Sequence, residues 1–197
     1  MRSVSGISLL ELLAGVTLAA LAASLVLPAL GDMRSAALAA AGARHLAATL
    51  QGTRWKSVAQ GRTHGLRFIV DSSGWSWYEV QDGNGNGLRT SEILAGVDPT
   101  LSGPHRLEHV AQGVRLGLPQ AGPFPEVPPG SGWIEGLSDP VRFGNTDLVS
   151  FGALGTSSSG TLYVTDGDRQ LFAVVLYGKT AKIKVWRYVL GSGRWRA

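Results

Sequence analysis

A single carboxylate, Glu11, lies within the longest apolar stretch of the sequence. The stretch runs from residue 7 to residue 30 and reads ISLLELLAGVTLAALAASLVLPAL. As a helix of roughly 24 residues it would be about 36 Å long, enough to cross a hydrocarbon core of about 30 Å. A carboxylate inside a membrane helix costs about 2.5–3.5 kcal/mol on insertion scales, so Glu11 needs a partner or a task.

Two interpretations of Glu11 stay open. If the chain is cut after Gly6, Ile7 presents a new α-amino group in a region of low dielectric. Glu11 of a neighbouring subunit could neutralise that amine, because Coulomb attraction is much stronger there than in water. Glycine also suits a cleavage site, because it has no side chain to clash with a protease. The alternative is that Glu11 lies at the membrane interface and is stabilised by the helix dipole.

Positive charge is concentrated late in the sequence. After Asp168 the chain has seven basic residues and no acidic one, so this segment is +7 while the rest is −3. Five of these basic side chains are interleaved with aromatic residues and could bind phosphates beside stacked bases: Lys182, Lys184, Arg187, Arg194 and Arg196. The alternative, which we favour, is a strand with Lys182, Lys184 and Trp186 on its solvated face, opposite buried Ile183 and Val185.

Asp82, Asn84 and Asn86 have the spacing of the first half of a calcium-binding loop, D-x-N-x-N-G. The twelfth position is Ile93, where such loops carry glutamate. We favour a hairpin turn between strands at 75–80 and 88–94, because Asn, Asp and Gly tolerate positive φ. The sequence therefore offers a weak calcium candidate and no other metal site.

The remaining candidates for chemistry do not form a catalytic group. His105 and His109 are four residues apart, but no third metal ligand lies nearby in the sequence. Ser157, Ser158 and Ser159 lack the G-x-S-x-G spacing of a nucleophile elbow and are better explained as a polar turn. Without cysteine, disulfides and thiolate sites are excluded. We expect a protein that is not an enzyme, with no cofactor and no small-molecule substrate.

The elements that position these residues begin with a long helix. Pro28 should kink or loosen it, because proline lacks an amide hydrogen. Helical character resumes over 32–60, and Gly61 is a natural stop. One helical face carries small and apolar residues that should pack on a β-sheet: Ala39, Ala43, Leu46, Leu50 and Thr53.

After Gly61 the sequence changes to short runs rich in β-branched and aromatic residues, separated by Gly, Pro, Asn, Asp and Ser. The predicted strands cover residues 64–70, 75–80, 114–118, 148–151, 161–165, 171–177 and 182–190. Residues 117–132 are rich in Pro and Gly and are predicted to form a loop.

A secretory signal peptide is the alternative for the whole apolar segment. Ala20, Ala22 and Ala23 could supply a cleavage site. However, the apolar run exceeds the usual length of about 7–15 residues, and a carboxylate within such a core is unusual. We therefore favour a helix that the mature protein keeps.

The sequence from Gly6 to Glu11, GISLLE, resembles the prepilin processing motif, and Pro28 stands where many pilins carry a proline. This resemblance implies cleavage between Gly6 and Ile7 by a prepilin peptidase, with N-methylation of Ile7. Family members usually have Phe or Met at the position of Ile7. In such proteins the glutamate at the position of Glu11 serves filament assembly.

The order of the later elements, from the helix through DGNGNG to the C-terminal strands, is similar to that of the GspH/FimT group of minor pseudopilins and pilins. The resemblance implies an α+β, pilin-like fold, in which a long N-terminal helix packs on an antiparallel β-sheet head. The expected parts are a leader (1–6), a membrane-spanning assembly helix (7–30), its periplasmic continuation (31–61) and a β-rich head (62–197).

The function expected from this resemblance is that of a minor pseudopilin at or near the tip of a type II secretion pseudopilus. The protein would cross the bacterial inner membrane once, with its head in the periplasm, and contact other pseudopilins through its helix. The alternative is a FimT-type minor pilin that binds DNA. Such pilins use a GRxR-like motif, where this chain has Ala181-Lys182-Ile183-Lys184, and lysine cannot reproduce the bidentate geometry of arginine.

Overall fold

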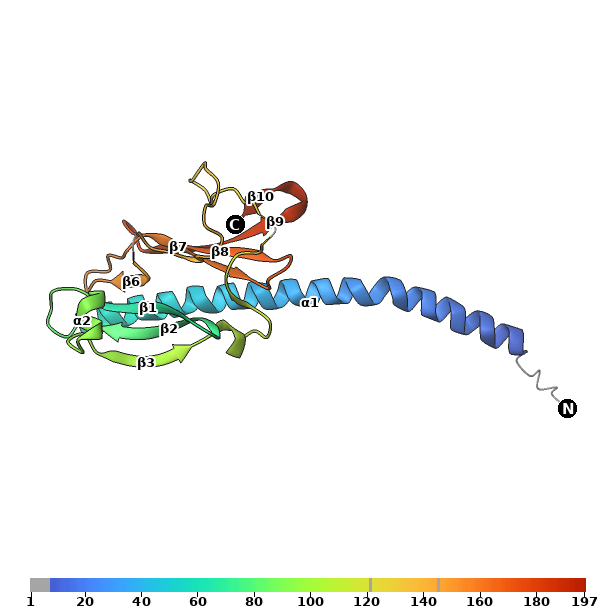
Figure 1. The fold of residues 1–197 in the computed structure, drawn as a ribbon, viewed down its shortest axis with the longest axis horizontal. Coiled ribbons are helices and arrows are strands. Elements are labelled where there is room, and N and C mark those ends of the chain that lie inside the picture. The colour runs from blue at the N-terminus through green and yellow to red at the C-terminus, as the bar shows by residue number, and fades with distance from the viewer. Residues whose placement is uncertain (1–7, 121, 145) are drawn as a thin grey trace. The chain divides into compact units, whose positions relative to one another are not determined.

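Helix α1 runs from Leu9 to Gln60 and is followed mainly by strands, which gives the chain its α+β organisation. The computed structural model describes residues 8–120, 122–144 and 146–197, without the side chains of residues 25–29. The chain divides into two compact units, Met1–Ala37 and Leu38–Ala197, and each is considered by itself. The second unit contains the antiparallel sheets (Figure 1). The predicted fold class, a long N-terminal helix with antiparallel sheets, is confirmed to this extent.

The described strands form two sheets. The four-stranded sheet has the order β3-β2-β1-β6, with β1 His64–Asp71, β2 Gly74–Gln81, β3 Thr100–His105 and β6 Leu148–Phe151. The six-stranded sheet has the order β10-β9-β8-β7-β4, with β5 also paired to β7; its strands are β4 Arg115–Leu116, β5 Val141–Arg142, β7 Gly160–Thr165, β8 Leu171–Tyr177, β9 Lys182–Val189 and β10 Arg194–Arg196. Short helical segments are α2 Thr90–Leu94, η1 Leu107–His109 and η2 Leu190–Ser192.

The C-terminal half of α1 packs into the main core of the second unit. The predicted face is buried as expected, with Ala39, Ala43, Leu46 and Leu50 fully inaccessible and Thr53 only 3% exposed. This face shares one hydrophobic cluster with residues of both sheets. Figure 1 shows this part of α1 between the two sheets. Gly61, at φ +63°, ends the helix as predicted, because glycine adopts this left-handed conformation without strain.

Gly42 of α1 packs closely against Val114, whereas Gly52 of the same helix has open space beside it. A Cβ at position 42 would lie 2.8 Å from Val114 Cγ1, whereas nothing lies within 4 Å of one at position 52. We expect Gly52→Ala to stabilise the protein by about 0.5–1 kcal/mol, through helix propensity alone. Gly42→Ala should instead destabilise it by about 1 kcal/mol, because overpacking outweighs that gain. Urea unfolding of both variants checks this, and equal stabilities would show that Val114 yields freely.

The six-stranded sheet is covered on both faces. Phe172, Val174 and Leu176 of β8 belong to the cluster that contains α1. Leu171, Ala173 and Val175 alternate with them and belong to a second cluster on the outer face. Apolar residues between β4 and β5 cover that outer face: Leu118, Phe124, Val127 and Ile134. Most of them lie in the predicted Pro/Gly-rich loop, whose described residues form no strand and cover the outer face of the sheet.

The prediction of a strand at 88–94 is wrong. Residues Thr90–Leu94 form α2, and Ile93 packs with Val80 and Leu148 in a third small cluster. The backbone before α2 is tied to nearby carboxylates, as described below, and therefore does not pair with β2. Instead β3, which the sequence analysis did not predict, is the antiparallel neighbour of β2. The two-residue strand β5 and the three-residue strand β10 were also not predicted.

His64, at the start of β1, should make folding stability depend on pH. It is 2% exposed, and its Nε2 lies 3.0 Å from Gln60 Oε1. Burial, and next the charge of Lys56, lower the pKa of His64 below its usual 6.5. The unfolded chain therefore takes up this proton first, so stability should fall as the pH drops through about 6.5 and level off below the folded pKa. His64→Gln should reduce the loss in unfolding temperature between about pH 7.5 and about pH 5. An unchanged loss would contradict this assignment.

Candidate assembly helix and basic surfaces

The start of α1 forms a capping motif around Glu11. Ser8 Oγ accepts a hydrogen bond from the backbone N–H of Glu11 at 3.2 Å. Ser-x-x-Glu at a helix start is the sequence of a capping box, and a carboxylate in the first turn is favoured by the helix dipole. Sequence analysis missed the contribution of Ser8, although the spacing was visible. Gly6 and Ile7, the predicted cleavage and methylation residues, lie outside the described residues.

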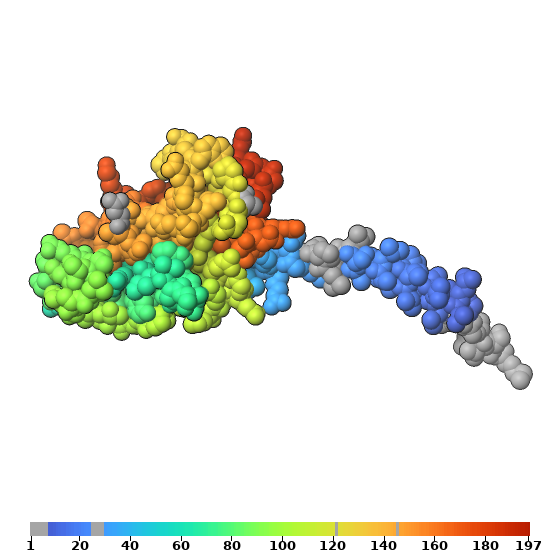
Figure 2. Space-filling model, in the orientation of Figure 1, coloured from blue at the N-terminus to red at the C-terminus, as the bar shows by residue number. Residues whose placement is uncertain are grey.

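The first unit exposes a long apolar surface. Residues 8–24 and 30–34 are all exposed. Figure 2 shows one face of residues 8–24 in blue. Nine large apolar residues are among them: Leu9, Leu10, Leu12, Leu13, Val16, Leu18, Leu21, Leu30 and Met33. Their exposed fractions range from 54% at Leu30 to 83% at Leu9. Contiguous apolar surface of this kind marks contact with a membrane or with other protein chains.

Within the described residues, no helix has the combination of length and hydropathy expected of a membrane span. Residue 7 and the side chains of residues 25–29, which belong to the predicted span, lie outside the described residues. Helix α1 continues through position 28, so Pro28 does not end it. The kink at Pro28 stays a prediction.

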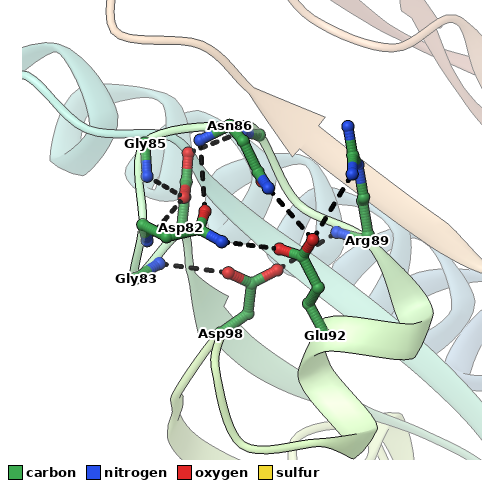
Figure 3. Close-up of polar contacts among 9 residues, drawn as sticks. Asp82, Gly83, Gly85, Asn86, Arg89, Glu92 and Asp98 are labelled. Carbon is green, nitrogen blue, oxygen red and sulfur yellow. Dashed lines mark hydrogen bonds and ion pairs between the residues drawn. The ribbon is translucent and has the colours of Figure 1, made fainter.

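Two buried carboxylates organise the loop that follows β2. Asp82 is 4% exposed, and its Oδ1 accepts the backbone N–H groups of Asn84 and Gly85 at 3.2 and 2.7 Å. Asp82 Oδ2 accepts the N–H of Gly87 at 2.8 Å. Asp98 is fully buried and accepts the N–H groups of Gly83 and Arg89, each at 3.1 Å (Figure 3). Five loop amides therefore find their acceptors on these two side chains.

The predicted calcium ligands have partners of their own in this loop. Asn84 Oδ1 accepts the N–H of Asn86 at 3.2 Å. Asn84 Nδ2 donates to Glu92 at 3.1 Å. Asn86 Nδ2 donates to the same carboxylate at 3.0 Å (Figure 3). In the described part of the chain, no group of three or more His, Cys, Asp or Glu could hold a metal ion. The arrangement supports a turn held by carboxylates, although the element after the turn is α2 rather than a strand.

The five basic residues considered as possible phosphate binders lie on two opposite faces of the six-stranded sheet. In β9, Ile183 and Val185 pack against the cluster that contains α1, whereas Trp186 and Tyr188 belong to the outer cluster. Because side chains alternate along a strand, Lys182 and Lys184 lie on the outer face and Arg187 on the other. Trp186 departs from the prediction, since it is only partly exposed rather than fully solvated.

Strand β10 places the other two arginines beside Arg187. Trp195 pairs with Tyr188 and packs in the outer cluster, so Arg194 and Arg196 point to the opposite face. Arg196 stands directly opposite Arg187 across the two strands. Arg187, Arg194 and Arg196 are all exposed. The guanidinium group of Arg187 also donates a hydrogen bond to Gln170 Oε1 at 3.4 Å. We call this group of three the arginine edge.

On the outer face, the two lysines lie at the end of the β8–β9 hairpin. Lys182 pairs with Tyr177, and Lys184 pairs with Val175. The ammonium group of Lys184 lies 4.0 Å from the centre of the Trp186 ring, a cation–π contact. A cavity of about 770 Å³ opens here, lined by Ser159, Tyr177, Gly178, Lys179, Thr180, Lys182 and Lys184. Sequence analysis did not foresee this cavity.

Three of the other candidates, His105, Ser158 and Ser159, make hydrogen bonds within the fold. His105 Nε2 lies 3.0 Å from Ser102 Oγ in β3, while His109 is in η1, so the two histidines do not share a helix face. Ser158 Oγ accepts a hydrogen bond from the backbone N–H of Ser150 at 3.0 Å, and Ser159 Oγ donates one to a carbonyl oxygen of β8. Burial raises the pKa of Tyr163 to about 12, so this phenol is neutral at physiological pH.

No protein-family model and no curated protein sequence matches this chain. One solved structure that resembles it is the minor pseudopilin EpsH from the type 2 secretion system of Vibrio cholerae. The identity is 13% and the TM-score 0.42, and the match covers 75% of this chain and 94% of EpsH.

Proposed function

We propose that the protein is a minor pseudopilin, a structural subunit of a pseudopilus that supports protein export. The observation that carries the proposal is the exposed apolar surface of residues 8–24 and 30–34, with Glu11 in the first turn of α1. The same helix continues without a break into the core of the second unit. Such a helix can occupy a membrane before assembly and bundle with copies of its kind afterwards.

In this proposal a prepilin peptidase cuts between Gly6 and Ile7, and the new amino group of Ile7 is methylated. The protein spans the bacterial inner membrane once before assembly, with its second unit in the periplasm. During assembly Glu11 neutralises the amine of a neighbouring subunit. The apolar residues of α1 then leave the lipid and pack against other helices. The task is mechanical, and no reaction is assigned to the protein.

The intact mass of the mature protein from bacterial membranes tests this proposal. A chain that begins at N-methylated Ile7 is the expected result. A chain that begins beyond Ala20 would overturn the proposal in favour of an exported protein with a removed signal peptide. The same preparation should show the protein in complexes with other pseudopilins.

DNA binding by a type IV minor pilin is the second candidate function, and the arginine edge favours it. Arg187 and Arg196 are like charges directly opposite each other, an arrangement that destabilises the strand pair. A phosphate backbone would offset that repulsion. The purified chain should then bind duplex DNA with an affinity that falls steeply with salt, and Arg194→Gln/Arg196→Gln should weaken it. Absence of binding at low salt would exclude this candidate.

A further inference from the structure

The cavity at the end of the β8–β9 hairpin is basic and has apolar walls. Its lining includes three lysines and no carboxylate. Ser159, Tyr177 and Lys182 come from three adjacent strands or their ends, on the outer face of the sheet. We call this the lysine pocket, made of Ser159, Tyr177, Lys179, Lys182 and Lys184.

The hydroxyl groups and the ammonium groups of the lysine pocket differ in their interaction partners. Tyr177 donates its hydroxyl to the carbonyl oxygen of Pro128 at 3.4 Å, and Ser159 donates to that of Leu176 at 3.3 Å. The described residues provide no carboxylate partner for the three ammonium groups. Lys184 is instead held over the Trp186 ring. The three lysine ammonium groups are therefore available to a ligand, and a ligand with carboxylates would complement their charge.

We propose that the lysine pocket docks an acidic segment of a neighbouring pseudopilin, with carboxylates on Lys182 and Lys184 and apolar atoms against the cavity wall. This inference rests on the proposed function, which supplies the neighbour. A peptide fits the geometry better than a nucleic acid does. The ring of Trp186 already contacts Lys184, and the arginine edge lies on the opposite face, so the described basic residues do not form one continuous track for phosphates and bases.

Fluorescence anisotropy with a labelled hexaglutamate peptide tests the proposal on the purified chain in detergent. Binding should be measurable at low ionic strength. Lys182→Gln/Lys184→Gln should weaken it about tenfold, because two charge-assisted contacts are lost. Arg194→Gln/Arg196→Gln removes the same charge from the opposite face and should leave peptide affinity nearly unchanged. Lys182→Arg/Lys184→Arg should retain binding.

Each contrary result would overturn the docking proposal. The first is absence of peptide binding, and the second is an equal loss of peptide affinity in the lysine and arginine variants. The third is a labelled DNA duplex that binds more tightly than the peptide and whose affinity falls in Lys182→Gln/Lys184→Gln. Failure of the proposed function would appear elsewhere, in the mature N-terminus and in the Glu11 variants, because peptide binding by the purified chain needs no filament. The two failures are therefore distinguishable.

Discussion

Glu11→Gln is expected to abolish incorporation of the protein into a pseudopilus and the protein export that depends on it. Two unit charges about 4 Å apart attract each other by ~4 kcal/mol at an effective dielectric constant of about 20. Loss of even half of this, about 2 kcal/mol, lowers an association constant about 30-fold. Glutamine keeps the shape of the side chain and can still serve a capping box, so the variant removes the charge alone. The measurement is the amount of variant that co-purifies with other pseudopilins, together with the level of exported protein.

Ser8→Ala is the matched control for this prediction. It removes the hydroxyl that accepts the Glu11 N–H and should cost about 1 kcal/mol of helix stability, while the carboxylate stays in place. We expect near-normal assembly from this variant. Equal losses in both variants would mean that the Glu11 charge acts by stabilising the start of the helix through its dipole, rather than by pairing with a neighbouring subunit. Normal assembly of Glu11→Gln would remove the assembly role altogether.

The sequence predicts the fold best where a periodic pattern is long. The face of α1 from Ala39 to Thr53 was found in this way. The strand at 171–177 was found from its run of β-branched and aromatic residues, and core packing agrees with both predictions. Strand β10 was missed, because three residues are too few to show a period. Its position follows from Trp195, whose Nε1 donates to the carbonyl oxygen of Pro125 at 2.8 Å. Such a contact joins segments far apart in the sequence and leaves no local signal.

The positions of the C-terminal basic residues could not be predicted from composition. Five of them are close in the sequence, and composition alone groups them together: Lys182, Lys184, Arg187, Arg194 and Arg196. The alternation along β9 could have separated Arg187 from Lys182 and Lys184, because even and odd positions of a strand face opposite ways. The side of Arg194 and Arg196 depends on the register between β10 and β9, which no local pattern specifies. The division into a lysine pocket and an arginine edge therefore required the structure.

The strand predicted after the β2 loop was wrong for a related reason. A turn at residues 82–87 was expected, and the apolar residues after it suggested a second strand. The backbone N–H of Arg89 is instead bonded to Asp98, nine residues later, and residues from Thr90 onward form α2. A carboxylate outside residues 88–94 therefore holds the start of this segment, and the local pattern of these residues does not show it.

Asp82→Ala is expected to destabilise the protein by about 3 kcal/mol, because three backbone N–H groups lose a charged acceptor. The loss should be the same with EDTA and with added calcium, since the carboxylate stabilises the loop by itself. Urea unfolding of the purified chain, followed by tryptophan fluorescence, measures it. A calcium site would behave differently, because its stabilisation would depend on the ion concentration.

Asn84→Ala separates the two explanations of this loop. Asn84 is exposed and supplies two hydrogen bonds, to Asn86 N–H and to Glu92, so its removal should cost about 1 kcal/mol or less. If the loop bound calcium, Asp82 and Asn84 would both be ligands, and loss of either would remove a calcium-dependent rise in unfolding temperature. A large loss with Asp82→Ala, a small one with Asn84→Ala and no response of the unsubstituted protein to calcium would establish a loop held by its own carboxylates. A calcium-dependent rise that both variants lose would make the loop a metal site, with the backbone amides displaced from Asp82 by the ion.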